Sequence, residues 1–487
     1  MNRHLVQSAQ SVLVLAMLGG IDGCMVGPDY HRPQPDVATQ FNGTQVLSQR
    51  AAPATTAPVD AWWQGFSDPV LNRVVDTALR QNLTLAQALA RTIQAAAYAQ
   101  SADAQLLPSG QASASASRAR QSLEDPVTAA ENASLPGFNR TANLYGAGVS
   151  SVWEIDLSGG LRRSAHAALA EYQAAQADVA AARLQVTSNV VDNYLLVRLL
   201  QARLGVARAQ VSTQGDIERL VDVLRSRGLA PDQDAEQASS ELSVVRASVP
   251  LLEARLTAAR NGLDVLLGRT PGTADPELDK AAPIPIAPSI AAAGGSAELL
   301  RRRPDLMVGE RRLAASNERI GQAIAEYYPK VSLSALIGST TTQGGNLFDG
   351  ASNEALGTLG IRWRLFDFGR VDAQVKAAKG DYAVKLAGYR ESVLEATAEV
   401  ENSISALVTG DARTQMLTEG EHSRTQARDL VLASYQKGNS SYIDLLETQS
   451  RLELIQAQRL DASYAASASA VALYKALGGG WNQHTVQ

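Results

Sequence analysis

The stretch LYGAGVSSVWEIDL, residues 144–157, has a period of two residues, which is the period of a β-strand. One face collects its apolar side chains, Tyr145, Ala147, Val149, Trp153 and Ile155. The opposite face collects small or polar residues, Gly146, Gly148, Ser150, Glu154 and Asp156. This stretch therefore predicts a strand with one apolar face and one polar face.

Three further segments alternate in the same way and predict three more strands. They are residues 331–338, residues 359–365 and, with only alanine against serine, residues 111–117. Trp153 and Trp363 lie near the ends of their apolar faces, which suits an aromatic girdle at a membrane interface. Any one of these strands taken alone fits a half-buried strand of a soluble sheet equally well.

A long proline-free run of helical character follows each pair of strands. The runs cover residues 161–227 and 370–437, and the first is 67 residues long (227 − 161 + 1 = 67). At 1.5 Å per residue such a helix extends about 100 Å, which no globular core needs. Their alanine-rich composition, with many Gln, Arg and Glu residues, favours slender, closely packed coiled helices with a polar side.

The chain contains two copies of one plan. Six residues recur 210 positions on (363 − 153 = 210): Trp153, Gly159, Gly228, Asp234, Leu242 and Gly268 match Trp363, Gly369, Gly438, Asp444, Leu452 and Gly478. Five earlier residues recur at an offset of 221 (300 − 79 = 221): Leu79, Arg80, Leu85, Arg91 and Pro108 match Leu300, Arg301, Leu306, Arg312 and Pro329. Between these two blocks the first copy is therefore 11 residues longer than the second (221 − 210 = 11). The extra residues lie around residues 123–138, a polar stretch suited to an exposed loop. Fixed offsets of this kind indicate an internal tandem repeat.

The repeat and the proline-rich segments divide the chain into six parts. We expect a signal peptide, 1–23; a lipid-anchored extended N-terminal arm, 24–66; a first repeat of helix, β-hairpin, long helix and helix, 67–270; a linker, 271–296; a second repeat, 297–478; and a C-terminal tail, 479–487. The linker carries five prolines, and these cannot continue a helix.

The amino-terminal segment has the features of a secretory signal. Arg3 and His4 precede an almost wholly apolar run at residues 11–20, which is too short to span a bilayer. The only cysteine, Cys24, then follows Gly23 as in the processing box of lipoproteins, so we predict lipidation of Cys24. An ordinary cleaved signal followed by a stray cysteine is the alternative.

Composition excludes several classes of function. The net charge is -5, whereas nucleic-acid binding needs a clustered basic surface. The five histidines make no HExxH pair or triad neighbourhood, and no phosphate-binding glycine loop is present. We therefore expect no nucleic acid, catalytic residue, metal or cofactor, and the protein is not expected to be an enzyme. After residue 24 no run approaches the ~20 apolar residues of a membrane-spanning helix, so any crossing of a membrane must use strands.

Four strands in lipid leave unpaired edges, so a single chain cannot close a barrel. Two chains supply eight strands, and side chains fill the interior of an eight-stranded barrel. Three chains supply twelve strands, which leave room for a channel. All strands must enter one membrane while the helices project away from it, and this requires cyclic symmetry. The sequence therefore favours a homotrimer.

Several motifs together resemble the NodT branch of the TolC-like outer-membrane efflux proteins. They are residues 24–30 (CMVGPDY) with Pro33, the Trp62-Trp63 pair before residues 66–69 (FSDP), and residues 299–320 followed by Tyr328-Pro329. The resemblance covers nearly the whole chain. It implies an α/β membrane protein, a trimer with a 12-stranded outer-membrane β-barrel (four strands per chain) over a long α-helical coiled-coil periplasmic barrel. It also implies a lipid-anchored location in the outer membrane, extending into the periplasm.

The resemblance points to the two turns where each long helix enters the next. These turns contain Gly228 and Leu229 in the first copy and Gly438 and Asn439 in the second. In such families a periplasmic adaptor (membrane fusion) protein docks there, and an inner-membrane RND-type transporter supplies the energy. Ser440 stands where some relatives carry an arginine that locks the tip.

Residues 442–447 (YIDLLE) resemble the family's periplasmic gate. Ile443, Asp444 and Glu447 share one helix face, and Asp234 is the first-copy counterpart of Asp444. In a trimer these residues are expected to form apolar and acidic rings that narrow the pore and favour cations. Alternatively, acids in a first helical turn only complement the helix dipole.

The function that follows is an outer-membrane channel of a tripartite efflux system, passively conducting drugs or other small molecules. Two alternatives stay open at this point, a protein-secretion exit duct and a non-conducting structural coiled-coil lipoprotein. The lipid anchor and the NodT-like motifs favour small-molecule efflux over protein secretion, and the duplicated two-faced strands disfavour the structural lipoprotein.

Overall fold

The computed structural model describes residues 25–34, 40–48, 50, 59–273, 276–290 and 302–481. These residues belong to two units, which we describe separately. Unit 1 comprises Met1–Pro33, Ile93–Gln173 and Glu310–Ala387, and unit 2 comprises Gln34–Thr92, Ala174–Gly309 and Gly388–Gln487. The predicted signal peptide and Cys24 lie outside the described residues.

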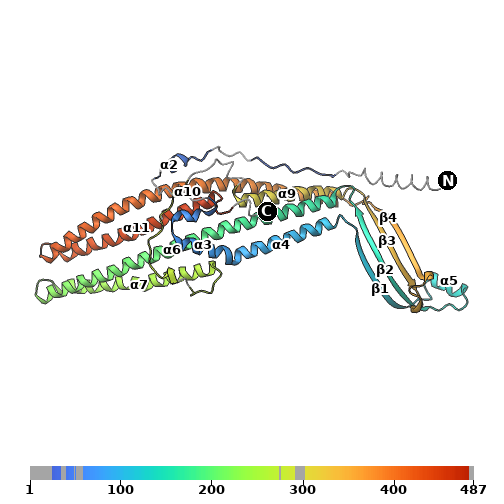
Figure 1. Ribbon diagram of the computed structural model, residues 1–487, viewed down its shortest axis with the longest axis horizontal. Coiled ribbons are helices and arrows are strands. Elements are labelled where there is room, and N and C mark those ends of the chain that lie inside the picture. The colour runs from blue at the N-terminus through green and yellow to red at the C-terminus, as the bar shows by residue number, and fades with distance from the viewer. Residues whose placement is uncertain are drawn as a thin grey trace. The chain divides into compact units, whose positions relative to one another are not determined.

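Unit 1 contains an antiparallel sheet of four strands in the order β1-β2-β3-β4 (Figure 1). The strands are β1 (Ser109–Arg120), β2 (Thr141–Ile155), β3 (Lys330–Thr341) and β4 (Asn353–Arg362). All four predicted strands are therefore confirmed, but the predicted bounds of the last were wrong. It starts earlier and stops at Arg362, so Trp363 and Leu365 lie beyond it.

The register of the sheet separates an apolar face from a polar one. On the apolar face Ala116 lies opposite Tyr145, Val149 opposite Ile337 and Leu333 opposite Leu359. The other face carries mainly serine, glycine and threonine, among them Ser113, Ser115, Gly148, Ser334, Gly338 and Thr358. Val149, Ile337 and Leu359 are 58%, 72% and 67% exposed, so no described residue covers the apolar face at these positions. Near the second hairpin the loop between β3 and β4 does cover it, since Ser339 is buried and donates to the Leu347 carbonyl.

The connection between β1 and β2 is the longer of the two hairpin loops, as the repeat offsets predicted. It is mostly exposed and contains α5 (Pro126–Ser134). The Asp125 side chain caps this helix by accepting hydrogen bonds from the N–H groups of Val127 and Thr128. In the second hairpin, two short turns, η3 (Gly344–Asn346) and η4 (Gly350–Ser352), take the place of the helix.

The two long runs form the helices α6 (Gly160–Ser226) and α10 (Arg370–Gln436), close to the predicted bounds. They are followed by α7 (Asp232–Leu266) and α11 (Tyr442–Ala476). The remaining described elements are α2 (Thr44–Ser48), η1 (Val59–Phe66), α3 (Pro69–Gln81), α4 (Leu83–Ala104), η2 (Pro276–Leu278) and α9 (Pro304–Ala325). None of the helices in the described ranges is long and apolar enough to cross a membrane.

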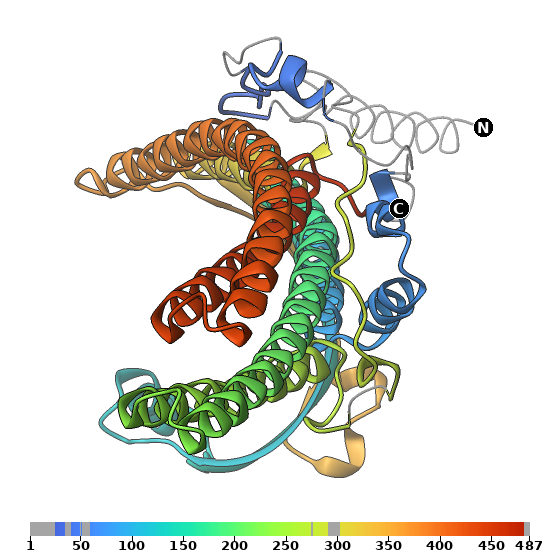
Figure 2. The same ribbon diagram turned by 90° about the vertical axis from the view of Figure 1, so that its left-hand side faces the viewer.

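In unit 2 two helix pairs are formed (Figure 2, green and orange-red): residues 174–226 of α6 pair with α7, and residues 388–436 of α10 pair with α11. Leu200 and Leu204 of α6 pack with Leu256 of α7 in one hydrophobic cluster. In the second pair, α10 and α11 approach each other closely at Gly410. A Cβ on Gly410 would stand 3.1 Å from the Cα of Ala466. The absence of a side chain at Gly410 thus allows these two helices to pack closely at this point.

Candidate functional site

The turn from α6 to α7 is closed by its own backbone. Gly228 donates its N–H to the carbonyl of Arg225 (2.9 Å), and Leu229 donates to the carbonyl of Leu224 (2.9 Å). Gly228 has φ +69°, a left-handed conformation that costs glycine nothing. These bonds form a Schellman motif, which satisfies carbonyls that the end of a helix would otherwise leave unpaired.

The turn from α10 to α11 repeats this geometry. Gly438 (φ +75°) donates to the carbonyl of Tyr435 (2.9 Å), and Asn439 donates to the carbonyl of Ser434 (3.0 Å). Leu229, with 71% of its surface exposed, and Asn439 both face solvent, and no atom lies within 4 Å of a Cβ built on either turn glycine. In a single chain, the four residues predicted to bind an adaptor are therefore accessible to a partner protein.

Asp444 and Ser441 form a capping box at the start of α11. The Asp444 carboxylate accepts hydrogen bonds from the N–H (3.0 Å) and the hydroxyl (2.7 Å) of Ser441, and the Asp444 N–H donates to the Ser441 Oγ (3.2 Å). The bond from the Ser441 hydroxyl is the main cause that lowers the pKa of Asp444 below its ordinary value. Asp444 therefore caps the start of α11 within one chain.

Ile443 and Glu447 lie on the surface beside Asp444. Ile443 is 62% exposed, and Glu447 pairs with Arg451 one turn further along α11. Arg451 was not among the residues predicted for the gate. An exposed pair of this kind adds little stability, but it partly neutralises the charge that Glu447 brings to the predicted acidic ring.

Asp234 lies with a pair of buried tyrosines, Tyr435 and Tyr442. Their ring centroids are 6.1 Å apart, and Gln214 donates a hydrogen bond to the Tyr442 hydroxyl (3.4 Å). Burial is the main cause that raises the pKa of each phenol, and the negative charge of Asp234 adds to it. Asp234 is half-buried beside this pair, whereas its counterpart Asp444 is exposed.

The tyrosine pair joins the two helix turns in one hydrophobic cluster. Ile217 and Val221 of α6, Ala235 and Ala238 of α7, Tyr435 of α10, and Tyr442 and Leu445 of α11 belong to it. Sequence reasoning missed the tyrosines, although a signal existed. Their first-copy counterparts, 210 positions earlier, are Arg225 and Asp232, so the tyrosines break the repeat at the turn.

Trp153 and Trp363 occupy equivalent places in the two copies. Trp153 donates its indole N–H to the carbonyl of Leu106 (2.9 Å), and Trp363 donates to the carbonyl of Tyr327 (2.9 Å). Leu106 and Tyr327 are themselves separated by the offset of the opening block (327 − 106 = 221). Each indole therefore ties the strand end of its copy to the residues that follow α4 or α9.

The segment that follows Cys24 is held by Arg163, whose side chain is 1% exposed. Arg163 donates to the carbonyls of Val26 (3.1 Å) and Gly27 (3.2 Å) and pairs with Asp29 (3.0 Å) and Glu318 (2.9 Å). Val26 also donates its N–H to the Ser158 carbonyl (3.1 Å), where β2 leads into α6. None of these contacts was predicted.

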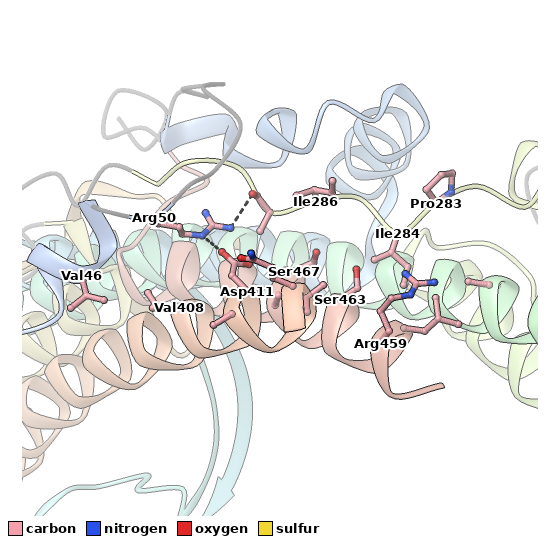
Figure 3. Close-up of a pocket in the computed structure, with 17 residues that line it drawn as sticks. Val46, Arg50, Pro283, Ile284, Ile286, Val408, Asp411, Arg459, Ser463 and Ser467 are labelled. Carbon is pink, nitrogen blue, oxygen red and sulfur yellow. Dashed lines mark hydrogen bonds and ion pairs between the residues drawn. The ribbon is translucent and has the colours of Figure 1, made fainter. Parts of the chain in front are cut away.

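A pocket of about 800 Å³ lies in unit 2 (Figure 3). It is lined by Val46 and Arg50 of the arm, by Pro283, Ile284, Ile286 and Ala287 of the linker, by Ala202 of α6, and by side chains of α10 and α11. Arg50 pairs with Asp411 and donates to the carbonyls of Ala287 (3.1 Å) and Pro288, so it fastens the arm to α10 and to the linker. In the part of the chain that the structure describes, no group of three or more His, Cys, Asp or Glu could hold a metal ion.

Comparison with known proteins agrees with this architecture. The family model of the outer membrane efflux proteins matches the chain twice, over residues 74–269 and 296–479. The chain belongs to the outer membrane efflux protein family. The two matches correspond to the two copies of the repeat.

Individual members of the family align over almost the whole chain. Nodulation protein T of Rhizobium leguminosarum bv. viciae is 30% identical over 98% of this chain and 94% of its own length. The pyoverdine export outer membrane protein OpmQ of Pseudomonas putida is 31% identical over 89% of this chain and 91% of its own length. The outer-membrane channel OprN has a similar structure, with a TM-score of 0.84 and 30% identity over 94% of this chain and all of that one. The fold is thus that of the TolC-like outer-membrane channels. Of these relatives, OpmQ is named as an export protein and OprN as a channel.

Proposed function

We propose that three copies of this chain form the outer-membrane channel of a tripartite efflux system, which conducts small molecules passively and performs no chemistry. The observation that carries the proposal is the sheet of unit 1. Its apolar face is exposed on all four strands, and β1 and β4 each pair on one side only within the described residues. An apolar face suits lipid, and free edges suit closure with further copies.

Closure by three copies gives twelve strands, which leave an aqueous lumen lined by the serine- and glycine-rich face. The exposed apolar face would then meet the acyl chains of the outer membrane. Trp153 and Trp363 would lie at the membrane interface on the side from which the helices leave. An indole that has satisfied its N–H within the protein can expose its ring to the boundary between lipid and water.

The two Schellman turns are the proposed docking site for a periplasmic adaptor. Gly228, Leu229, Gly438 and Asn439 offer small, exposed backbone with one apolar side chain. An inner-membrane RND-type transporter would supply the energy. Selection of the substrate would belong to that transporter, so the pyoverdine in the name of one relative does not identify the substrate of this chain.

Ile443, Asp444, Glu447 and Asp234 are the proposed gate. The exposed Ile443 and Asp444 support this role, because side chains turned to solvent in one chain are available to line a pore axis. Asp234 would act from a second position, beside the tyrosine pair, because it is half-buried there. Arg451 would weaken any acidic ring through its pair with Glu447.

Lipidation of Cys24 in the periplasmic leaflet is also part of the proposal. The contacts of Arg163 and the bond from Val26 to Ser158 support it, because they hold the residues after Cys24 beside the junction of β2 and α6. From this position the acyl chains on Cys24 would reach the membrane without a long tether. Labelling with palmitate should therefore mark the native chain and not Cys24→Ser.

Single-channel conductance of the purified full chain in planar bilayers tests the function. We expect a small, cation-selective conductance that grows in the double variant Asp444→Ala and Glu447→Ala. Absence of conductance from both proteins, each verified as a folded trimer, would leave a structural lipoprotein as the better interpretation. Co-purification with an adaptor of a protein-secretion system would instead favour a secretion duct.

A further inference from the structure

Two arginines interrupt the apolar face of the sheet at one end. Arg118 and Arg120 are two residues apart on β1, so both lie on the face that carries Ala112, Ala114 and Ala116. The other charged residues among the paired positions of the four strands all lie on the polar face: Glu154, Lys330, Glu354 and Arg362. The apolar face therefore carries charge only at Arg118 and Arg120.

The position of Arg118 matches the height of a membrane. Its partner in the register is Asn143, which lies ten residues before Trp153 on β2 (153 − 143 = 10). Ten residues of strand extend about 34 Å, and a tilt of about 40° reduces this to about 26 Å along the membrane normal. The outward apolar band of membrane barrels is about 25 Å tall. If Trp153 marks one interface, Arg118 lies at the other.

The order of the elements along the chain identifies the membrane interface at which Arg118 lies. β1 follows α4 and β2 leads into α6, so the helices leave from the Trp153 end of the hairpin. Arg118 and Arg120 lie at the opposite end, near the loop that contains α5. With the helices in the periplasm, as the proposed function requires, this end meets the outer leaflet.

Both guanidinium groups are available to a ligand. Arg118 and Arg120 are exposed, and neither forms an ion pair with an acidic side chain of the described residues. Two acids, Glu124 and Asp125, follow Arg120 in the sequence, and Asp125 is engaged in capping α5. The residues opposite them on β2, Asn143 and Thr141, are neutral.

We propose that Arg118 and Arg120 bind the phosphates of a phosphorylated glycolipid of the outer leaflet. Arginine binds phosphate through two parallel N–H bonds, and two arginines about 7 Å apart on one strand face can hold a sugar headgroup that carries more than one phosphate. Below them, the exposed Ala116 and Ala114 continue the apolar face and would contact the acyl chains. The inference rests on the proposed barrel, to which it adds a lipid ligand and a site.

Binding of bisphosphorylated lipid A to the purified full-length trimer in detergent tests the proposal, with native mass spectrometry as the readout. We expect the double variant Arg118→Gln and Arg120→Gln to bind it about tenfold or more weakly, because two charge-assisted contacts are lost. Arg362→Gln is the matched control, since Arg362 lies on the polar face and at the opposite end of the sheet. This variant should bind lipid A as the native chain does. The double lysine variant keeps the charges but not the paired N–H bonds, and it should bind with intermediate affinity.

Two further probes identify the source of the phosphate. Inorganic phosphate and phosphatidylglycerol should each bind more weakly than lipid A, and their binding should respond less to the double glutamine variant. Equal binding of lipid A by the native chain and that variant would overturn the proposal, as would a stronger preference for phosphatidylglycerol. A native chain that neither trimerises nor conducts would contradict the proposed function instead, so the two failures are distinguishable.

Discussion

Gly478 packs directly against the backbone of Arg302: a Cβ on Gly478 would stand 2.7 Å from the Arg302 carbonyl oxygen. Its counterpart Gly268 packs in the same way against the carbonyl of Gln81, and both glycines have positive φ, +69° and +68°. The residues that they meet are related by the other offset of the repeat (302 − 81 = 221). The two copies of the repeat therefore share this packing contact as well as identical residues.

Gly478→Ala should be much more destabilising than Gly438→Ala. Both glycines have positive φ, but only at Gly478 would the new methyl group collide with backbone. We expect a loss of about 1 kcal/mol at Gly438, from the left-handed conformation alone, and about 2–4 kcal/mol at Gly478. Thermal unfolding followed by circular dichroism checks this, and equal losses at the two positions would contradict it.

Arg163→Met should release the residues that follow Cys24. It removes the donor to Val26 and Gly27 and leaves the carboxylate of Glu318, 11% exposed, without its partner. Breaking a buried pair in this way costs about 3–5 kcal/mol. Hydrogen exchange should show loss of protection of the Val26 amide, whose N–H donates to the Ser158 carbonyl.

Arg319→Met is the control for Arg163→Met. Arg319 pairs with Glu171 at the surface, where the two side chains are 44% and 37% exposed, and the loss should stay below about 1 kcal/mol. Adding Glu318→Gln to Arg163→Met should recover part of the stability, since the unpaired charge is then removed. If protection of the Val26 amide survives in Arg163→Met, contacts other than those of Arg163 hold this segment in place.

Ser441→Ala should separate capping from ion selectivity at the gate. It removes the hydroxyl of the capping box but leaves the charges of Asp444 and Glu447, so we expect a loss of about 1 kcal/mol and unchanged cation selectivity. Asp444→Asn retains an acceptor but no charge, and it should reduce the selectivity measured as a reversal potential in a salt gradient. An equal change of selectivity in both variants would mean that Asp444 acts only by ordering the start of α11.

Asp192 should make the protein less stable as the pH rises from about 4 to about 6. Burial is the main cause that raises the pKa of this carboxyl from 3.8 to about 6, against the opposing charge of Lys475, and one of its oxygens has no hydrogen-bond partner. The unfolded chain therefore loses the Asp192 proton at a lower pH than the folded chain, so the contribution of this group to stability is greatest below about pH 4 and falls until about pH 6. The difference is about 3 kcal/mol for two pKa units.

Asp192→Asn should remove this dependence and raise stability at pH 7. The control is Asp216→Asn, because the Asp216 side chain is 64% exposed and pairs with Arg219 on the surface of the same helix. Denaturant unfolding at pH 4 and pH 7 checks both variants. A pH dependence that persists in Asp192→Asn would assign it to another group.

The local periods of the chain were enough to predict most of its elements. A period of two marked the strands, and long proline-free runs marked α6 and α10, because each signal depends only on neighbours in sequence. The end of β4 was the exception. Residues 363–365 continue the alternation, but Trp363 turns its indole to the Tyr327 carbonyl and lies outside the ladder.

The sequence by itself determined the repeat, the two-faced strands, the helix lengths and the glycine turns, since glycine at positive φ and apolar alternation are properties of short segments. Only the tertiary structure decided which distant groups meet. It placed Arg163 among Val26, Asp29 and Glu318, and Asp234 beside Tyr435 and Tyr442. The physical reason is that the energy of a buried charge depends on the partner that replaces water around it, and that partner comes from a remote part of the chain.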